Sequence, residues 1–486
     1  MSKFQPLSVY ERPLDAGYKL LPFAFTHLEQ DDYVLTNQVG DFIVLPRRTL
    51  EEFVRHRLPY SDPAYNNLKA KHLLVDGDSN VCFDLLALKR RTKLEHLANF
   101  TALHIFVVSL RCEHSCPYCQ VSRQSDDRLA YDMSAETAER ALEFVFRSPS
   151  KAIKIEFQGG EPLLNFDRIR HIVLQAKQIN ETERRDLQFV IATNLALVTD
   201  EMLSFCKEHE ILISTSLDGP KDLHNKNRPR PGGDSYERAV NGITRARAVL
   251  GHDRVGALMT TTRASLPRGR EIIDEYVRLG FQGIFLRPLS PYGFAVKTKS
   301  IRAYDRDAWL RFYFDGLDYI LSLNRNGRRF VEFFAATVAT KMLTPGNPGY
   351  VDLMTPAGIG IGVLVYNYDG DVYASDESRM LAEMGDKTFR LGNLHKDSYE
   401  EIVLSDSLLN PLEESFAPSA PMCTECAFEP FCGSDPVYHY ATQRDYVGRK
   451  PISDFCQRNM AIFRRLITLM REDADTRAIF QDWATR

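Results

Sequence analysis

The chain has 486 residues, of which 44% are hydrophobic and 26% are charged. These values are typical of a globular protein with two or three domains. A net charge of −4 gives no reason to expect nucleic acid or an anionic membrane as a partner. No apolar run approaches about eighteen residues and no secretory leader is recognisable, which predicts a cytoplasmic protein. Seven of the nine cysteines fall in metal-like spacings, which suits the same reducing compartment better than disulfides do.

Residues 1–100 predict a small α+β domain. Two strand-like segments, 33–37 and 41–46, flank a short turn. A helix is expected to begin at Thr49, because this residue and a glutamate three positions later form a capping-box pattern. The basic run 89–93 is interpreted as a solvated linker rather than a binding patch.

Strand and helix patterns then alternate six times, from residue 101 to about 300. A continuous apolar run at 103–110 is suited to a buried parallel strand. Five more strands are expected at 152–158, 187–194, 211–218, 255–261 and 283–289, each separated from the next by a helical pattern. This order predicts an α/β fold with a partial, TIM-like (β/α)6 barrel. Its active site is expected at the carboxyl ends of the strands.

A cysteine-rich loop, RCEHSCPYC, directly follows the first of these strands. Its spacing C-x3-C-x2-C places the thiols of Cys112, Cys116 and Cys119 within eight residues. Three thiolates in one loop can hold three corners of a cubane iron–sulfur cluster and leave the fourth iron open for chemistry. A structural zinc ion with a distant fourth ligand is the alternative, since no further cysteine occurs before Cys206.

The loop after the second strand reads QGGEP, which comprises Gln158, Gly159, Gly160, Glu161 and Pro162. Its two glycines would allow a close backbone approach to a ligand, and the carboxylate could accept hydrogen bonds from an ammonium group. A plain turn is the alternative interpretation.

Further polar side chains end the later strands. Asn194 ends the third strand, and Ser216 and Asp218 end the fourth, where they are candidate hydrogen-bond partners for a ribose or a substrate. Asn194 would alternatively cap the next helix. Arg287, at the end of the sixth strand, is a weaker candidate for ligand contact.

The pattern changes after a helical stretch near 305–323. Residues 363–375 predict two strands around an Asp-Gly turn, so the glycine-rich run before them is rejected as a nucleotide loop. Four thiols follow, with the spacing C-x2-C-x5-C-x23-C. They belong to Cys423, Cys426, Cys432 and Cys456. Such a set can close around zinc or a [4Fe–4S] cluster, and spacing alone does not decide between them.

The RCEHSCPYC loop resembles the radical S-adenosylmethionine (SAM) superfamily, and Tyr118 before the last cysteine fits that pattern. The resemblance implies a [4Fe–4S] cluster on the three cysteines, with SAM on the open iron. Reductive cleavage of SAM then yields a 5′-deoxyadenosyl radical that abstracts hydrogen from a substrate. It also implies that the QGGEP loop binds the SAM amino group and that Arg228 binds the SAM carboxylate.

The C-terminal region resembles the SPASM extension of radical SAM peptide maturases, which normally carries two auxiliary clusters. Three expected cysteine positions hold Thr355, Ser375 and Pro436 instead. The resemblance therefore implies one auxiliary [4Fe–4S] cluster on the four C-terminal cysteines and loss of the other. Asp376 lies where sulfatase-maturing relatives place a catalytic base, although an exposed turn aspartate is the alternative.

Residues 432–457 and 10–23 together resemble the maturase B component of His-Xaa-Ser peptide systems. This resemblance implies a precursor peptide as substrate, a second radical SAM maturase as partner, and an electron donor such as flavodoxin or ferredoxin. The hairpin and helices of residues 1–100 also have the outline of leader-peptide-binding modules, though a packing domain fits equally well. The radical SAM core is then expected at 101–300 and the auxiliary-cluster domain at 301–486.

Two other functions fit the same residues. One is oxidation of a serine or cysteine to an aldehyde, as in sulfatase maturation. The other is a non-catalytic peptide-binding scaffold with structural zinc in its C-terminal site.

Overall fold

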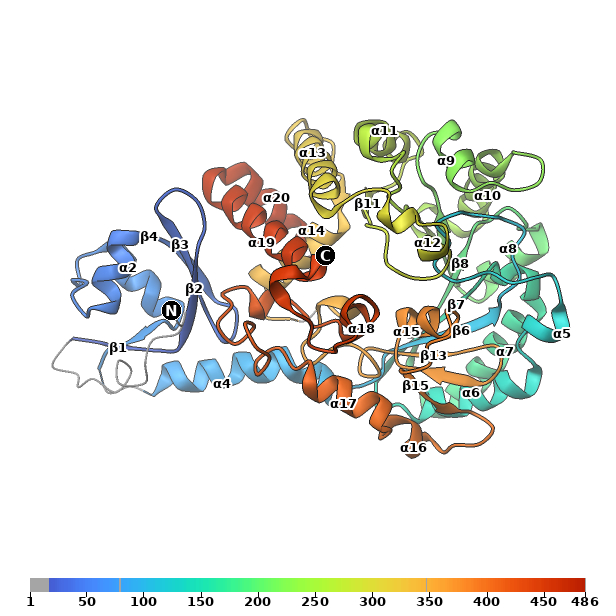
Figure 1. The fold of residues 1–486 in the computed structure, drawn as a ribbon, viewed down its shortest axis with the longest axis horizontal. Helices are drawn as coiled ribbons and strands as arrows, with labels where there is room; N and C mark the ends of the chain where they lie inside the picture. Colours follow the sequence, from blue (N-terminus) through green and yellow to red (C-terminus); the bar gives the residue numbers. More distant parts are fainter. Residues whose placement is uncertain (1–16, 78–79, 347, 486) are drawn as a thin grey trace.

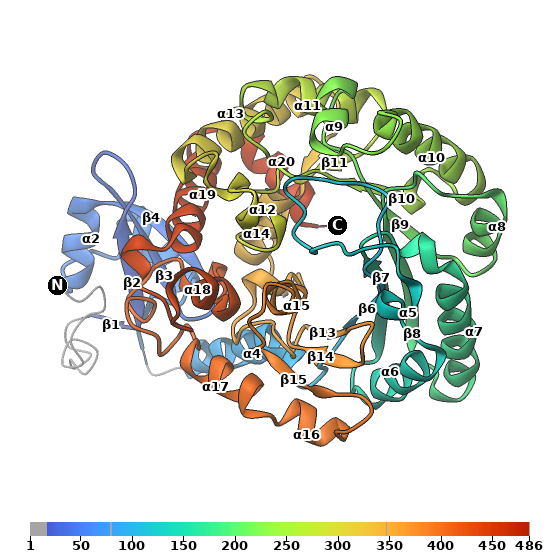
Figure 2. The same ribbon diagram turned by 45° about the vertical axis from the view of Figure 1, so that its right-hand side comes forward.

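The computed structural model describes residues 17–77, 80–346 and 348–485. Its centre is an eight-stranded sheet with the strand order β10-β9-β8-β7-β6-β13-β14-β15, around which helices form an outer layer (Figure 2). Five parallel strands come first in the chain: β6 (Leu103–Ser109), β7 (Ala152–Gly159), β8 (Asp186–Thr193), β9 (Leu212–Ser216) and β10 (Val255–Leu258). The predicted α/β barrel is confirmed.

The barrel strands form where apolar residues run without interruption. In β6, Phe106, Val107 and Val108 are fully buried, as expected for a parallel strand covered on both faces. The connecting helices are α6 (Ala135–Arg147), α7 (Phe166–Glu183), α8 (Asp200–Glu208), α9 (Lys221–Asn227), α10 (Ser235–Leu250) and α11 (Gly269–Arg278). Ser134 caps α6, because its hydroxyl accepts a hydrogen bond from the Thr137 amide at 3.0 Å.

The sixth strand is much shorter than predicted. Only β11 (Gly283–Ile284) is extended, and it pairs with β12 (Val331–Glu332) outside the eight-stranded sheet. The chain turns just after it, where the Arg287 amide donates to the Phe285 carbonyl, and Pro288 has no N–H for a sheet ladder. The segment still follows the barrel, since the Thr261 amide donates to the Arg287 carbonyl at 2.9 Å.

The C-terminal part extends the barrel sheet, which the sequence did not indicate. β13 (Val363–Tyr366) pairs in parallel with β6, while β14 (Asp371–Tyr373) and β15 (Arg390–Asn393) continue antiparallel. The predicted hairpin around Gly370 is confirmed, and this glycine has a φ of +84°. Strand β6 therefore has a hydrogen-bonded neighbour on each side, β7 and β13.

The N-terminal part has its own sheet and core. β2 (Phe23–His27), β3 (Asp32–Asn37) and β4 (Phe42–Pro46) are antiparallel, and β1 (Lys19–Leu20) pairs with β5 (Leu74–Val75). Two helices, α2 (Arg47–Val54) and α3 (Pro63–Ala70), pack against this sheet. The predicted cap at Thr49 was wrong, because α2 begins at Arg47 with Pro46 as its N-cap and no side-chain capping bond.

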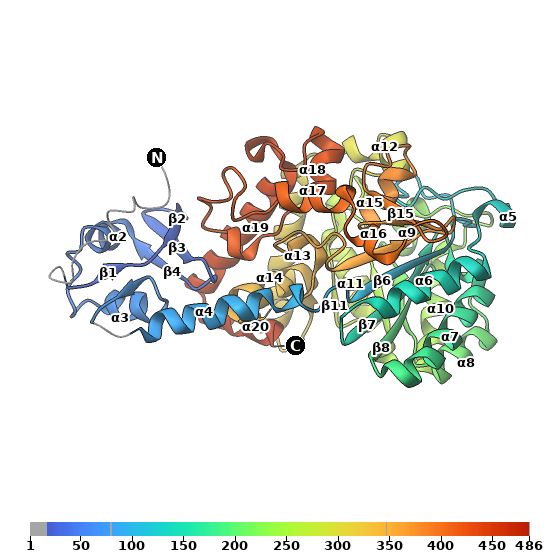
Figure 3. The same ribbon diagram turned by 90° about the horizontal axis from the view of Figure 1, so that it is seen from below.

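The basic run 89–93 is not a linker but the end of helix α4 (Val81–Leu94). This helix runs along the underside of the molecule from the N-terminal sheet toward the barrel (Figure 3). Lys89 forms an ion pair with Asp41 at 2.7 Å, and Arg90 donates to the Gln38 carbonyl. These side chains therefore fasten the helix to the β3–β4 turn.

Long helices near the C-terminus lie between the N-terminal part and the barrel (Figure 1). They are α13 (Arg306–Arg325), α14 (Phe333–Leu343), α19 (Asp454–Glu472) and α20 (Ala474–Ala484). The shorter helices are α5 (Arg128–Tyr131), α12 (Phe294–Lys297), α15 (Asp376–Ala382), α16 (Tyr399–Val403), α17 (Asp406–Glu414) and α18 (Pro436–Gln443). Among the described helices, none is long and apolar enough to cross a membrane.

Candidate active site

One large cavity opens at the carboxyl ends of the barrel strands and encloses about 1710 Å³, its open side included. Most residues predicted for the site line it together. They are Cys112, Cys116, Tyr118, Cys119, Gln158, Gly159, Gly160, Asn194, Ser216, Arg228 and Asp376. Arg287 lines it as well, whereas Glu161, Pro162 and Asp218 lie behind its wall. The sequence pattern thus located the cavity, and the structure separates the residues that face it from those that support it.

Arg111 fixes the start of the cysteine loop. Its guanidinium is 2% exposed and donates to both Asp132 oxygens, at 2.8 and 2.7 Å, and to the Leu164 carbonyl at 2.8 Å. The bidentate pair ties the start of the loop to the segment before α6, and the bond to Leu164 ties it to the turn after β7.

We expect Arg111→Met to lower the free energy of unfolding by about 3–5 kcal/mol, because it leaves the half-buried Asp132 carboxylate without its counter-charge. The matched control is Arg140→Met on the outer face of α6, whose ion pair with Glu143 is half exposed on both sides. It should cost no more than about 1 kcal/mol. Urea unfolding under anaerobic conditions measures both, and equal losses would contradict the assigned role of Arg111.

The glycines of the QGGEP loop allow this loop to pack closely against another segment of the backbone. A Cβ atom on Gly159 would lie 1.9 Å from the Ser109 carbonyl oxygen, and one on Gly160 would lie 2.3 Å from that of Arg111. The close approach therefore joins this loop to the cysteine loop. Both glycines also line the cavity, so a ligand contact there stays a prediction.

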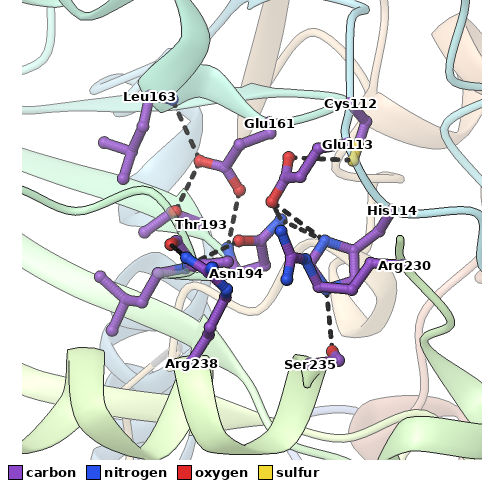
Figure 4. Close-up of polar contacts among 12 residues, drawn as sticks. Cys112, Glu113, His114, Glu161, Leu163, Thr193, Asn194, Arg230, Ser235 and Arg238 are labelled. Carbon is purple, nitrogen blue, oxygen red and sulfur yellow. Dashed lines mark hydrogen bonds and ion pairs between the residues drawn. The ribbon is translucent and has the colours of Figure 1, made fainter. Parts of the chain in front are cut away.

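The Glu161 carboxylate is already engaged by the protein. It accepts hydrogen bonds from the Thr193 hydroxyl at 2.6 Å, the Asn194 amide at 2.9 Å and the Leu163 amide at 3.0 Å (Figure 4). Burial raises the pKa of Glu161 to about 8. The geometry assigns this residue to joining the ends of β7 and β8, and contact with an ammonium group stays a prediction.

A chain of polar contacts runs behind the cysteine loop (Figure 4). Asn194 donates to Glu113 at 2.9 Å, Glu113 lies 3.0 Å from His114 Nδ1, and His114 Nε2 lies 2.8 Å from the Ser235 hydroxyl. That hydroxyl also lies 3.1 Å from His224 Nε2. The chain connects the loop to the starts of α9 and α10, and the sequence reasoning missed it.

Arg228 is held by a buried carboxylate. Its Nε lies 3.2 Å from Asp218 Oδ1, and its guanidinium lies 5.5 Å from the centre of the Tyr118 ring. The Tyr118 hydroxyl donates to Asp218 Oδ2 at 2.5 Å. Burial alone would lower the pKa of Arg228, but Asp218, Tyr118 and Cys116 together outweigh it and raise the pKa. A permanent positive charge therefore stands at the cavity wall beside the thiols.

The four C-terminal thiols form a second set away from the cavity. Cys423, Cys426 and Cys432 belong to the loop before α18, and Cys456 lies in the first turn of α19. Burial raises the pKa of Cys423 and of Cys456 to about 12, and the other thiols of the set add to this.

The thiols of each cysteine set are not gathered around one point. Within the described residues, three possible ligand atoms lie within 4.8 Å of one another only at Cys112, Glu113 and His114. Sulfurs around one tetrahedral zinc ion stand about 3.8 Å apart, as Zn–S bonds of about 2.3 Å require. No three thiols of either set meet this spacing, and zinc and a [4Fe–4S] cluster both stay open for the C-terminal set.

The sequence pattern described as "Radical SAM superfamily" matches residues 106–263. An uncharacterized protein of Methanothermobacter thermautotrophicus is 31% identical over 213 residues, which span 43% of this chain and 72% of that protein. This chain belongs to the radical SAM superfamily. The superfamily implies SAM and a [4Fe–4S] cluster as cofactors, and the loop thiols and Arg228 on one cavity fit them.

A sulfatase-maturing enzyme and a peptide-binding structure are also similar to this radical SAM protein. The "Cysteine-type anaerobic sulfatase-maturating enzyme" of Clostridium perfringens is 24% identical over 341 residues, which cover 68% of this chain and 87% of that enzyme. The structure of Streptococcus suis SuiB bound to precursor peptide SuiA has a TM-score of 0.53 at 15% identity. It covers 90% of this chain and 98% of SuiB. At that identity the likeness shows a shared fold.

In this radical SAM chain, two of the three positions without expected cysteines have structural roles. Ser375 caps α15 in a capping box with Ser378, and Pro436 is the first residue of α18. Asp376 faces the cavity and forms an ion pair at 2.9 Å with the fully buried Arg379. Its role as a catalytic base stays a prediction. Of the segment 10–23, residues 10–16 lie outside the described residues.

Proposed function

We propose that this radical SAM enzyme modifies a ribosomally made precursor peptide with His-Xaa-Ser repeats, by hydrogen abstraction through a 5′-deoxyadenosyl radical. The observation that carries this proposal is the single cavity at the strand ends, which collects the three loop thiols, the Arg228 charge and polar strand-end side chains. The cavity is also open on one side, as a peptide substrate would need. Similarity to SuiB and to a sulfatase-maturing enzyme supports a substrate that is itself a polypeptide.

In this proposal, different residues of the active-site cavity bind the cluster, bind SAM and accept a proton. Cys112, Cys116 and Cys119 would hold the cluster, and Arg228 would bind the SAM carboxylate, kept in place by Asp218. When bound and reduced, the cluster supplies the electron that cleaves SAM. Asn194 and Ser216 face the cavity as hydrogen-bond partners for the rest of the cofactor. Asp376 is proposed to accept the proton that the substrate loses.

The remaining parts extend this proposal. Cys423, Cys426, Cys432 and Cys456 would hold one auxiliary [4Fe–4S] cluster, which would accept the second substrate electron. The N-terminal part, residues 1–100, would bind the leader of the precursor. The barrel spans 101–300 and the auxiliary-cluster part 301–486. A second maturase and a flavodoxin or ferredoxin would complete the system.

The test is anaerobic incubation of the reconstituted protein with SAM, dithionite and the precursor peptide. We expect 5′-deoxyadenosine to appear together with a peptide that has lost two hydrogens. We expect about eight irons per chain from two cubane clusters. About four irons with one zinc would instead make the C-terminal site structural. A peptide product that reacts with a hydrazide would reveal an aldehyde and favour sulfatase-type chemistry, and an unchanged peptide would reject the proposal.

A further inference from the structure

A second cavity continues inward from the active-site cavity, toward the C-terminal helices. It encloses about 610 Å³, its opening included, and it shares Arg287, Tyr350, Asp352 and Glu377 with the active-site cavity. We call it the inner cavity. It lies beside the first turns of α15 and α18, next to Ser375 and Pro436, where the sequence lacks the cysteines of a further cluster. A substrate in the active site could therefore reach into a space that no cluster ligands line.

Three residues that line the inner cavity carry buried polar atoms without hydrogen-bond partners. Tyr292, Trp309 and Asn459 are 0%, 2% and 1% exposed, yet the described residues offer no hydrogen bond to the Tyr292 hydroxyl, the Trp309 Nε1 or the Asn459 Oδ1. Each such unpaired atom carries a desolvation penalty. A guest with polar atoms would remove these penalties.

Carboxylates outnumber guanidinium groups in the lining of the inner cavity. The Glu377 carboxylate and the Arg287 guanidinium attract each other across this cavity, and each favours the charged form of the other. The lining holds three carboxylates and two guanidinium groups, so one negative charge is in excess when all are ionised. They belong to Asp352, Glu377, Asp435, Arg287 and Arg458. Burial and the neighbouring acids raise the pKa of Glu377 and that of Asp435, and the nearby Arg287 and Arg458 offset only part of this rise.

The excess charge and the walls suit an organic cation rather than a metal ion. The carboxylate oxygens do not converge, since no three of them lie within 4.8 Å of one another among the described residues. Aromatic rings form much of the wall, namely Phe285, Tyr292, Trp309, Phe334, Tyr350 and Phe455. Arg458 already lies over the Trp309 and Phe455 rings, at 5.8 and 5.6 Å from their centres. Such rings attract a cation through their faces.

We propose that the inner cavity receives one positively charged side chain of the peptide substrate and thereby fixes which neighbouring residue faces the cysteine loop. This inference rests on the proposed function for the identity of the guest. Glu377 and Asp352 would bind the cation at the entrance, and the unpaired Tyr292 hydroxyl would lie deeper. These residues would set specificity without touching the reacting atoms.

Small probes test the cavity itself. Trp309 is one of two tryptophans in the chain and lines the inner cavity, so its fluorescence reports occupancy. n-Butylammonium chloride should change the emission saturably at constant ionic strength, whereas neutral 1-butanol should not. The change should vanish in Trp309→Phe. Glu377→Gln should weaken the affinity for the ammonium about tenfold, by removing one charge-assisted hydrogen bond. Equal responses to both probes, or an unchanged affinity in Glu377→Gln, would overturn the proposal.

A matched control and a substrate assay complete the test. Glu413→Gln, on the exposed side of α17, should leave the affinity unchanged. If Glu377→Gln does not fold, Asp352→Asn replaces it with the same expectation. In turnover assays, the positively charged peptide residue that occupies the inner cavity is changed to glutamine. This change should raise KM for the parent enzyme but not for Glu377→Gln. Cation binding without peptide modification would reject only the proposed function, and modification without cation binding would reject only this inference.

Discussion

Replacement of Cys112, Cys116 and Cys119 by alanine is expected to reduce release of 5′-deoxyadenosine to the level seen without enzyme. The three thiols are the only protein ligands proposed for the SAM-binding cluster, and they face the cavity together. Without them, electrons from dithionite have no route to bound SAM. Iron should fall from about eight to about four atoms per chain, because the C-terminal set remains intact. Chromatography of the nucleoside and iron analysis measure the two results.

Cys206→Ala is the matched control for this variant. Cys206 lies in α8, is 2% exposed and packs within the main apolar core. Its replacement should leave nucleoside release and iron content unchanged and cost only a modest part of the stability. Nucleoside release at the parent rate by the triple variant would show that the loop holds no reactive cluster.

Features encoded within a few neighbouring residues were predicted well from the sequence. The apolar run of β6 and the thiols that follow it lie within seventeen consecutive positions, 103–119. The local sequence pattern alone therefore predicts the strand β6, the position of the loop after it and the three thiols in that loop. The prediction failed where tertiary contact overrides a local signal. Thr49 has the pattern of an N-cap, yet α2 begins two residues earlier, directly from the edge strand β4.

Contacts between segments far apart in the sequence could not be predicted from the sequence pattern. His114 meets Ser235 across 121 positions, and the acids of the inner cavity come from three separate segments. The QGGEP loop shows a related limit. Its glycines and Glu161 suggested ligand contact, but tight packing against the cysteine loop and β8 explains the same residue types. A glycine motif thus indicates that another group packs closely against the backbone, but it does not indicate whether that group is a ligand or another part of the protein.

Asp218→Asn is expected to weaken SAM binding about tenfold or more and to lower the free energy of unfolding by about 3–5 kcal/mol. Asp218 accepts hydrogen bonds on both oxygens, from Tyr118 at 2.5 Å and from the Thr260 amide at 3.3 Å, and it also pairs with Arg228. An asparagine amide must turn one N–H group toward a donor. It also leaves the buried guanidinium of Arg228 without a counter-charge.

Asp222→Asn is the matched control, because it removes a carboxylate charge from the same segment without disturbing the contacts of Arg228. Asp222 pairs with Arg268 on the surface, and its side chain is 72% exposed. Its replacement should change stability by no more than about 1 kcal/mol and leave SAM affinity as it was. Equilibrium binding of SAM and anaerobic urea unfolding measure both variants. If Asp218→Asn binds SAM as tightly as the parent, Arg228 does not depend on this carboxylate, and the positive charge at the cavity wall is positioned by the Tyr118 ring instead.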